Sequence, residues 1–288
     1  MAADGFLQRA AALPRLGLGL STEYGASRAD GALDPNAMRR EHPELARFLE
    51  VGVEIAKGLD EDARTWAESG AATTYHFLDI NLDDPEDFDD AWLADVRACA
   101  ATLRPAWLCG DAGLWHFGAR DRGQMLLLPP VLEPEAVGPM AAGIVRLRDA
   151  IGLEVLPENP PCTHFVGRMH LLEFFAAVAE QADTGLLVDC AHLGMFQRIR
   201  GHGLLDGFDA LPWDRVIEVH VAGGRERSHD GYAWVDDDHG PTILDDTWTL
   251  LDEVLARASN LRALVVECER NPLPRAAAML REVGERWR

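Results

Sequence analysis

The feature that most constrains the fold is a short apolar run that recurs eight times along the chain, each time followed by a turn and an amphipathic stretch. These runs predict eight strands, at residues 15–21, 48–55, 73–82, 105–113, 153–160, 185–192, 215–224 and 262–269. Apolar residues at helical spacing predict helices between them, among others at 89–103, 133–151, 168–182 and 246–258. Strands that alternate with helices favour a parallel sheet with right-handed crossovers. Eight such units close into a single (β/α)8 TIM barrel, an α/β fold that commonly takes about 250 residues.

An open, doubly wound sheet is the alternative arrangement of the same elements. It normally carries a glycine-rich GxGxxG turn between the first strand and the first helix. The stretch GLGLSTEYG at 17–25 has its first glycines within the predicted strand and does not spell this motif. Because the chain also lacks internal repeats and long flexible linkers, we expect one domain over residues 1–288, with the barrel core at about 13–275.

The balance of charges narrows the range of partners. Acidic residues number 48 and basic residues 27, which gives a formal net charge of −21. Nucleic acids and anionic membranes bind basic surfaces, so we expect neither as a partner.

The sequence has no apolar run of membrane-spanning length and no signal-peptide pattern at its start. Five cysteines without a CxxC pair fit a reducing compartment, and we expect a cytoplasmic protein.

Carboxylates and imidazoles gather at the carboxyl ends of the predicted strands. They are His76, Asp111, Glu158, Asp189, His192, Glu218, His220, Asp237, His239, Glu267 and Glu269. Singly, each has an ordinary explanation: Asp111 and Asp189 could cap the helices that follow, and a lone histidine is most often structural. In a barrel, however, these strand ends meet at one mouth. Buried carboxylates at such density cannot all stay ionised without a cation, and the mixture of carboxylate and imidazole suits iron, manganese or zinc better than magnesium or calcium.

The stretch WVDDDHGPT at 234–242 places three aspartates before a histidine. Adjacent like charges repel and are poor formers of helices or strands, so the stretch is either a solvated acidic loop or part of a cation site. Asp237 and His239 are two residues apart and can face the same metal, which would turn Asp238 away. Cys190 and Cys268 follow candidate ligands directly, and we expect them to point to the opposite face, between barrel and helices.

Taken together, the motifs resemble a known family. The matching stretches are LGLGLSTEY, LEVGVEI, YHFLDINL, LPENP, LLVDCAHLGM, VIEVHVAGG, VDDDHGP followed by DDTW, and LVVECERNPLP, in this order over roughly residues 13–275. They are similar to those of the DUF692 group, the multinuclear non-heme iron-dependent oxidases, which is itself similar to the xylose-isomerase-like barrels. Each stretch alone is weak, but the combination of ENP, EVHVAG and Asp-x-His-Gly is fairly specific.

The resemblance implies a TIM barrel that holds two or three iron ions at its mouth and uses O2 as co-substrate. It implies the metal ligands His76, Asp111, Glu158, Asp189, His192, His220, Asp237, His239 and Glu267. Of these, His76, Asp111, Glu158 and His220 are the residues to which we assign catalysis. The implied activity is oxidation of a cysteine, aspartate or asparagine in a ribosomally made precursor peptide, and many members act with a small partner protein that recognises the peptide leader.

The sequence departs from the family at three places. Ala112 stands where a histidine is expected at the end of the fourth strand, Cys268 replaces a common tryptophan, and the second strand lacks a histidine. Two interpretations of the first departure stay open. Either His116 substitutes from the following loop, or one iron site is missing or altered.

Other polar residues near the mouth are expected to act on the ligands or on the substrate. Glu218 and Glu269 are expected to orient ligand imidazoles. Arg225, Arg227 and Arg270 could hold a peptide carboxylate by paired hydrogen bonds, although a surface ion pair with the many acids is the more common role of such arginines. The residues from which we expect substrate contact are Asn159, Trp115, His116, Arg225 and Arg270.

Three other functions compete with the oxidase. A sugar isomerase or epimerase with manganese or cobalt could use Glu158, Asp189, His220 and Glu267, with carboxylates as proton-transfer bases and no need for O2. A phosphodiesterase of the endonuclease-IV type is opposed by the acidic charge. A barrel that has lost its metal and its activity stays open because of Ala112.

Overall fold

A computed structural model describes residues 5–22, 31–118 and 126–287; Glu23 and Tyr24 of the first family motif lie outside these ranges. Eight parallel strands close into a barrel in the order β1-β10-β7-β6-β5-β4-β3-β2, which confirms the predicted fold. The strands are β1 (Gly17–Thr22), β2 (Phe48–Val53), β3 (Ala72–Phe77), β4 (Leu108–Asp111), β5 (Val155–Glu158), β6 (Leu186–Asp189), β7 (Val216–Ala222) and β10 (Ala263–Glu267). Each lies within or overlaps a predicted strand.

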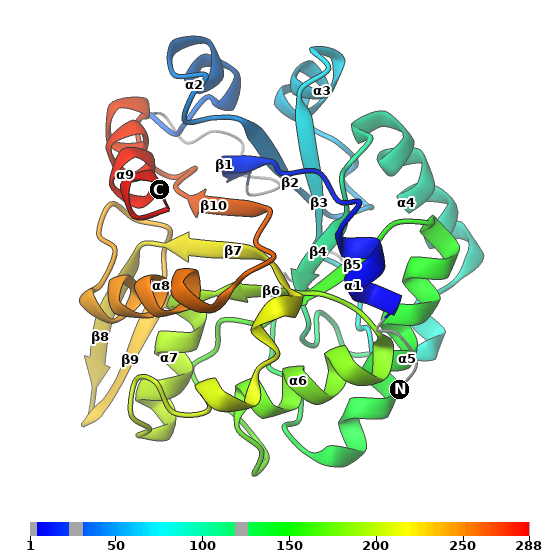
Figure 1. The fold of residues 1–288 in the computed structure, drawn as a ribbon, viewed down its shortest axis with the longest axis vertical. Coiled ribbons are helices and arrows are strands. Elements are labelled where there is room, and N and C mark those ends of the chain that lie inside the picture. The colour runs from blue at the N-terminus through cyan, green and yellow to red at the C-terminus, as the bar shows by residue number, and fades with distance from the viewer. Residues whose placement is uncertain (1–4, 23–30, 119–125, 288) are drawn as a thin grey trace.

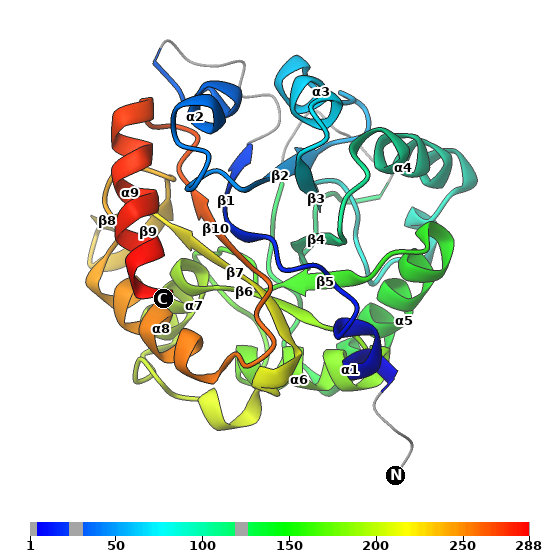
Figure 2. The ribbon, with the colours of Figure 1, turned by 45° about the horizontal axis from the view of Figure 1, so that its top comes forward.

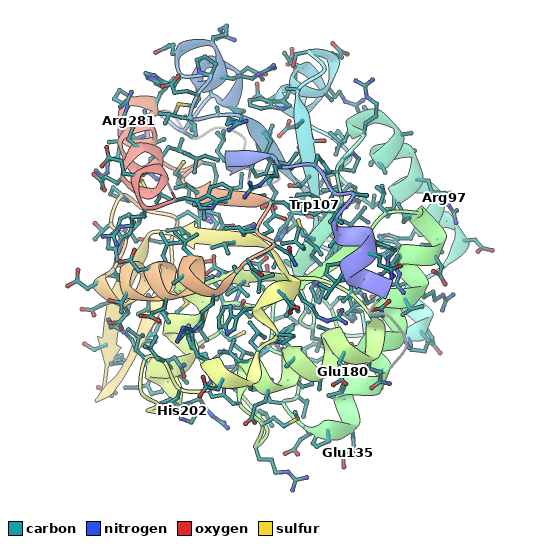
Figure 3. All side chains as sticks on the ribbon, in the orientation of Figure 1. Arg97, Trp107, Glu135, Glu180, His202 and Arg281 are labelled. Carbon is teal, nitrogen blue, oxygen red and sulfur yellow. The ribbon has the colours of Figure 1, made fainter. Side chains whose placement is uncertain are left out.

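Helices surround the strands, as Figures 1 and 2 show from two directions. They are α1 (Gly5–Ala10), α2 (Pro35–Glu41), α3 (Glu61–Glu68), α4 (Asp90–Leu103), α5 (Pro134–Ile151), α6 (Leu171–Ala182), α7 (Cys190–Arg200), α8 (Asp245–Arg257) and α9 (Leu273–Arg286), with short 3₁₀ turns at Pro85–Asp87, Phe208–Ala210 and Trp213–Arg215. Several begin at an aspartate whose side chain accepts a backbone N–H, as Asp89 does for α4. Figure 3 shows charged side chains such as Arg97, Glu135 and Arg281 on this outer layer. No helix among the described residues is long and apolar enough to cross a membrane.

Apolar side chains close the N-terminal end of the barrel. Phe6 of α1 packs with Phe48, Trp107 and Leu156 from the barrel strands and their approaches, and all four are fully buried. Gly19 makes room for this packing, because a Cβ there would lie 2.4 Å from the ring of Phe48. In Figure 3, Trp107 lies among the strands near the middle of the barrel. The opposite, C-terminal end is therefore the one that can form a site.

An antiparallel hairpin, β8 (Gly224–His229) and β9 (Tyr232–Asp237), follows β7 and lies beside α7 and α8 (Figure 1). The prediction that the aspartate run is a poor strand former is wrong as far as Asp237. Alternation along β9 separates Asp236 from Asp237, and Arg227 on the neighbouring strand pairs with Asp236 at 2.6 Å. Beyond the strand, His239 turns the chain with a left-handed φ of 46°.

Candidate metal centre

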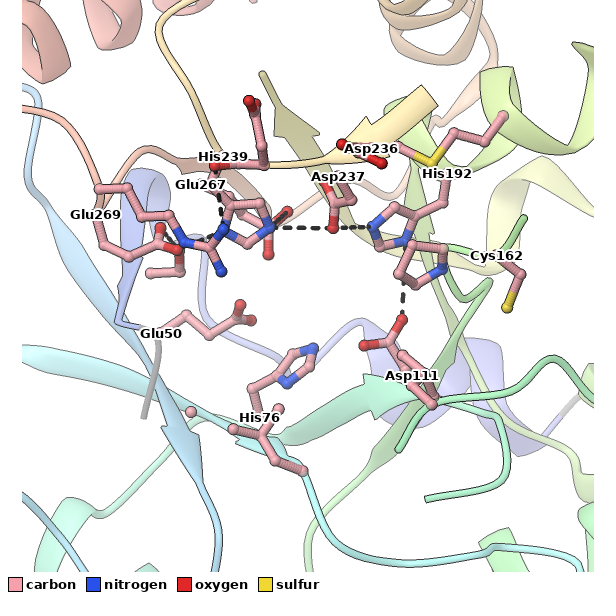
Figure 4. A pocket seen from close by; sticks show the side chains of 18 of the residues that line it. Glu50, His76, Asp111, Cys162, His192, Asp236, Asp237, His239, Glu267 and Glu269 are labelled. Carbon is pink, nitrogen blue, oxygen red and sulfur yellow. Dashed lines mark hydrogen bonds and ion pairs between the residues drawn. The ribbon is translucent and has the colours of Figure 1, made fainter. Parts of the chain in front are cut away.

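The nine predicted ligands converge at the C-terminal mouth of the barrel. A cavity of about 600 Å³ opens there, and Figure 4 shows the side chains that face it. Six of the predicted ligands line it: His76, Asp111, His192, Asp237, His239 and Glu267. The other three, Glu158, Asp189 and His220, are buried behind them, with at most 1% of each residue exposed.

Strand register explains this convergence. Asp111, Glu158, Asp189 and Glu267 are each the last residue of a strand. Asp111 of β4 is directly opposite Glu158 of β5, and Asp189 of β6 is opposite His220 of β7. Parallel strands that end at the same level bring such residues together although they are far apart in the sequence.

Glu158 lies at the centre of the mouth. Its Oε2 is 2.8 Å from Nε2 of His76, and its Oε1 is 3.3 Å from Nδ1 of His220 and 3.5 Å from Nδ1 of His192. One carboxylate thus faces three imidazoles. This is the arrangement expected of a residue that could contribute to more than one metal ion.

Asp237 joins a second group at the rim. Its Oδ2 lies 3.2 Å from Nε2 of His192 and 3.2 Å from Nε2 of His239, so the three side chains form the row seen in Figure 4. His192 donates from Nδ1 to the carbonyl of Asn159 at 2.8 Å, which leaves Nε2 facing Asp237. Asp238 instead pairs with Arg225 at 2.8 Å. Asp237 and His239 both line the cavity, as the spacing predicts, but Asp238 also borders it while it pairs with Arg225.

Six buried ligand atoms of the predicted set have no hydrogen-bond partner among the described residues. They are Asp111 Oδ1, Glu158 Oε1, Asp189 Oδ2, His220 Nδ1, Asp237 Oδ1 and Glu267 Oε2. A buried polar atom without a partner costs about 1–3 kcal/mol, more when it is charged, so six in one place require a common explanation.

Five of the six residues, all except Asp237, belong to compact groups that would suit a metal ion. In each of the three triads His76–Asp111–Glu158, Glu158–Asp189–His192 and Asp189–His220–Glu267, the ligand atoms lie within 4.8 Å of one another. Glu158 and Asp189 are shared between neighbouring triads. Carboxylate and imidazole in this proportion suit divalent iron, manganese or zinc. The donor set therefore fits a cluster of more than one ion.

Burial and mutual charge shift the pKa values of these groups. Burial alone would lower the pKa of His76, but the nearby Glu50 and Glu158 raise it to about 9. Burial raises the pKa of Asp189 to about 7; the charge of His192 opposes this rise, and that of Glu267 adds to it. In the metal-free protein, imidazolium protons thus supply the positive charge that the carboxylates need. A bound metal ion would replace these protons.

His116 does not take the place of the histidine missing at Ala112. Its Nε2 is 2.8 Å from Oδ2 of Asp87, its Nδ1 donates to the carbonyl of Gly118 at 2.9 Å, and it does not line the cavity. The structure therefore places His116 apart from the other candidate ligands and gives its two ring nitrogens other partners. Ala112 itself is fully buried and offers no side-chain donor.

Two of the predicted substrate contacts have other partners. The side-chain amide of Asn159 binds the backbone N–H and carbonyl of Asp189, at 3.0 and 2.9 Å, and so ties β5 to β6 outside the cavity lining. Arg225 is engaged in its ion pair with Asp238 and also does not line the cavity. The geometry therefore does not bring Asn159 or Arg225 into the cavity, and Arg225 forms the surface ion pair that the sequence left open.

Trp115 and Arg270 do line the cavity. The indole N–H of Trp115 donates to the carbonyl of Asp111 at 3.1 Å, which fixes the ring as part of the cavity wall. Arg270 reaches the carbonyl of Asp238 at 3.3 Å. These two remain the predicted substrate contacts that the geometry allows.

Carboxylates orient the imidazoles of His239 and His220. The first of them, Glu269, is the residue that the sequence predicted, and the second is not. Glu269 is hydrogen-bonded to Nδ1 of His239, as expected, and Ser21 holds it at 3.1 Å. Glu218 instead accepts from the indole of Trp107 at 2.6 Å, and among the described residues no hydrogen bond joins it to an imidazole.

Glu50, which sequence reasoning missed, is the residue beside His220. Its Oε2 lies 3.2 Å from Nε2 of that imidazole. When Nε2–H of His220 donates to Glu50, the other ring nitrogen, Nδ1, is left to face the mouth. The sequence could have predicted this position of Glu50, because side chains alternate along β2 and residues 50 and 52 both face the interior of the barrel.

Fold and mouth together define the class: a (β/α)8 barrel with acidic and imidazole side chains at its C-terminal end. Two solved structures share this fold. A xylose isomerase-like TIM barrel protein from Mycobacterium smegmatis in complex with magnesium has a TM-score of 0.59 at 13% identity and covers 96% of this chain and 97% of its own. D-psicose 3-epimerase in the presence of D-fructose has a TM-score of 0.54 at 14% identity, with 94% and 96% covered. At this identity the likeness concerns the fold alone.

Curated relatives extend the likeness to the sequence. A UPF0276 protein of Acaryochloris marina is 32% identical over 196 residues, which is 67% of this chain and 68% of the relative. A UPF0276 protein of Caulobacter vibrioides strain NA1000 is 29% identical over 275 residues, with 93% and 92% covered.

Residues 28–286 match the family described as RiPP precursor modification enzyme MbnB/TglH/ChrH, and the chain belongs to this family. RiPPs are ribosomally synthesised and post-translationally modified peptides, so the resemblance inferred from the motifs is confirmed.

Proposed function

We propose that this protein is a multinuclear iron-dependent oxidase that uses O2 to modify a cysteine, aspartate or asparagine of a ribosomally synthesised precursor peptide. Membership of a family of RiPP precursor modification enzymes supports the substrate class. The observation that supports bound metal is the set of six buried ligand atoms at the mouth that have no hydrogen-bond partner among the described residues. Bound ferrous ions would supply the electrons that reduce O2 and so allow the substrate residue to be oxidised.

The side chains of the mouth would hold the ions in overlapping groups. His76 and Asp111 form one side and Asp189, His220 and Glu267 the other, with Glu158 between them. His192, Asp237 and His239 form the row at the rim and could complete a further position. The absence of a donor at Ala112 argues that β4 contributes Asp111 alone.

The remaining residues of the site would hold these ligands and the peptide in place. Glu50 and Glu269 fix the ring orientation of His220 and His239, respectively. Trp115 forms an apolar wall that limits the access of water, and the guanidinium of Arg270 offers a charge for a peptide carboxylate.

The size of the cavity is consistent with a peptide substrate. At about 600 Å³ it falls within the range of sites for small molecules, roughly 300–1,000 Å³. It can therefore admit one or two side chains of an extended segment, but not a folded domain. A short precursor presented by a small leader-binding partner would satisfy this limit, and we propose such a partner for this chain.

The test is an assay for an oxygen-dependent change in peptide mass. Protein purified without air is loaded with ferrous salt and incubated with precursor peptides encoded by neighbouring genes, with and without O2, and with any small partner encoded beside them. We expect a mass change that needs both iron and O2, and that Glu158→Gln abolishes. Conversion of a ketose by the manganese-loaded protein in the absence of O2 would instead support an isomerase.

A further inference from the structure

A second group of polar side chains lies inside the barrel, below the mouth. It consists of Glu50 on β2, Cys109 on β4 and Glu218 on β7, each at most 1% exposed. Cys109 and Glu218 precede the mouth residues Asp111 and His220 by two positions, so they face the barrel interior one layer deeper. The ligand atoms of the three side chains lie within 4.8 Å of one another.

This layer is unusual because barrel interiors are normally filled by apolar side chains. Glu218 accepts at Oε2 from the indole of Trp107, at 2.6 Å, and interacts with the Cys109 thiol, while its Oε1 has no hydrogen-bond partner of good geometry among the described residues. Cys109 lies with its Sγ 3.1 Å from Oε2 of Glu50. Two carboxyl groups therefore share a buried layer with a thiol, and one carboxyl oxygen has no hydrogen-bond partner among the described residues.

His220 contacts this layer from the side of the mouth. Its Nε2 lies 3.2 Å from Oε2 of Glu50, while Nδ1 faces Glu158 and Glu267. The imidazole therefore reaches Glu50 and leaves Oε1 of Glu218 without a hydrogen-bond partner among the described residues.

We propose that Glu50, Cys109 and Glu218 form an interior site for one divalent transition-metal ion, one layer below the cluster at the mouth and adjoining it through Glu50. A thiolate with two carboxylates selects zinc, ferrous iron or cobalt over magnesium and calcium. The Cys109 thiol releases its proton to solvent as the sulfur binds the ion. Glu50 provides the route of entry, because it lines the mouth cavity and also belongs to the interior group. The ion would stabilise the strands beneath the catalytic mouth, whatever reaction takes place there.

The test is a titration of the metal-free protein with Co²⁺ in the absence of air. Cobalt bound to a thiolate gives a strong charge-transfer absorption in the near ultraviolet, whereas carboxylate and imidazole ligands do not. We expect this band in the wild type, and we expect Cys109→Ser to abolish it together with about one equivalent of bound cobalt. Glu218→Gln keeps an acceptor for Trp107 but removes a charge, so it should also lose the band.

Cys162 provides the matched control, because it is a second thiol that lines the mouth cavity. Cys162→Ser should keep the band at full strength. The proposal is overturned if the wild type shows no band, or if the band survives Cys109→Ser and disappears in Cys162→Ser. Circular dichroism checks that each variant folds, and Glu218→Gln decides the question if Cys109→Ser does not fold. The readout needs no peptide, so failure of the proposed oxidase activity would leave this result unaffected.

Discussion

At the N-terminal end of the barrel, Phe6, Phe48 and Trp107 fill the interior, and none of the three is exposed to solvent. At the C-terminal end, the same strands finish in carboxylates and imidazoles around a cavity of about 600 Å³. Burial of apolar surface stabilises the first end. At the second end, buried charges oppose one another, and their stabilisation must come from protons or metal ions. The comparison indicates that folding and binding rely on different ends of one barrel.

The largest effect should follow from Trp107→Ala at the closed end. Removing a fully buried indole leaves a cavity and deprives Glu218 of its hydrogen-bond donor, so the free energy of unfolding should fall by about 3–5 kcal/mol. The matched variant at the open end is Trp115→Ala, whose ring borders an existing cavity and should cost less. Urea denaturation of both metal-free proteins measures the difference. Equal losses would show that the two ends do not differ in this way.

Glu269→Ala should weaken metal binding. The variant removes the carboxylate that orients His239. Loss of such an orienting partner typically lowers metal affinity about 10–100-fold. Competition with a zinc chelator measures the affinity, since zinc is inert to O2. Glu253→Ala on α8, which removes an exposed pair with Arg257, should not change it. Zinc affinity equal to that of wild type in Glu269→Ala would contradict an orienting role.

Metal affinity at the mouth should rise with pH. In the metal-free protein the pKa of His76 is raised to about 9, so the imidazole is protonated below that pH and its proton must leave when a metal binds. Each displaced proton strengthens apparent binding about tenfold per pH unit, up to the pKa. Asp189, with a pKa of about 7, adds a second proton at lower pH, so the dependence should be steeper below about 7 than above it. Calorimetric zinc titrations in several buffers measure the protons released. A dependence that is flat between about 6 and 9 would argue that the ions do not bind at these side chains.

The convergence at the mouth could be predicted because it follows from topology. A residue that ends a parallel strand lies at the mouth wherever the strand falls in the sequence, so Asp111, Glu158, Asp189 and Glu267 required only the strand assignments. Two-residue spacing then placed His220 on the inner face. The same two-residue alternation in β2 predicts that Glu50 faces the interior, although this strand contains no histidine.

Residues in loops could not be placed in this way. His116 is held by Asp87, which is 29 positions away and itself lies in a 3₁₀ turn, so its orientation depends on how two loops pack. The same holds for β9, whose formation depends on pairing with β8 and on arginines that neutralise its aspartates. Such contacts arise from tertiary structure and leave no periodic signal in the sequence.

The smallest effect should come from Arg225→Ala on the hairpin. Arg225 forms an ion pair with Asp238, but its side chain is 58% exposed, and pairs of this kind contribute about 0–1 kcal/mol. The variant should therefore lower the free energy of unfolding by less than about 1 kcal/mol, and the difference should shrink further at high salt because screening weakens the wild-type pair. Urea denaturation at low and high ionic strength measures it. Zinc affinity should stay at the wild-type value, since Arg225 does not line the cavity. A loss of metal binding as large as that expected for Glu269→Ala would mean that the hairpin positions Asp237 and His239, and that the open end of the barrel extends to β8 and β9.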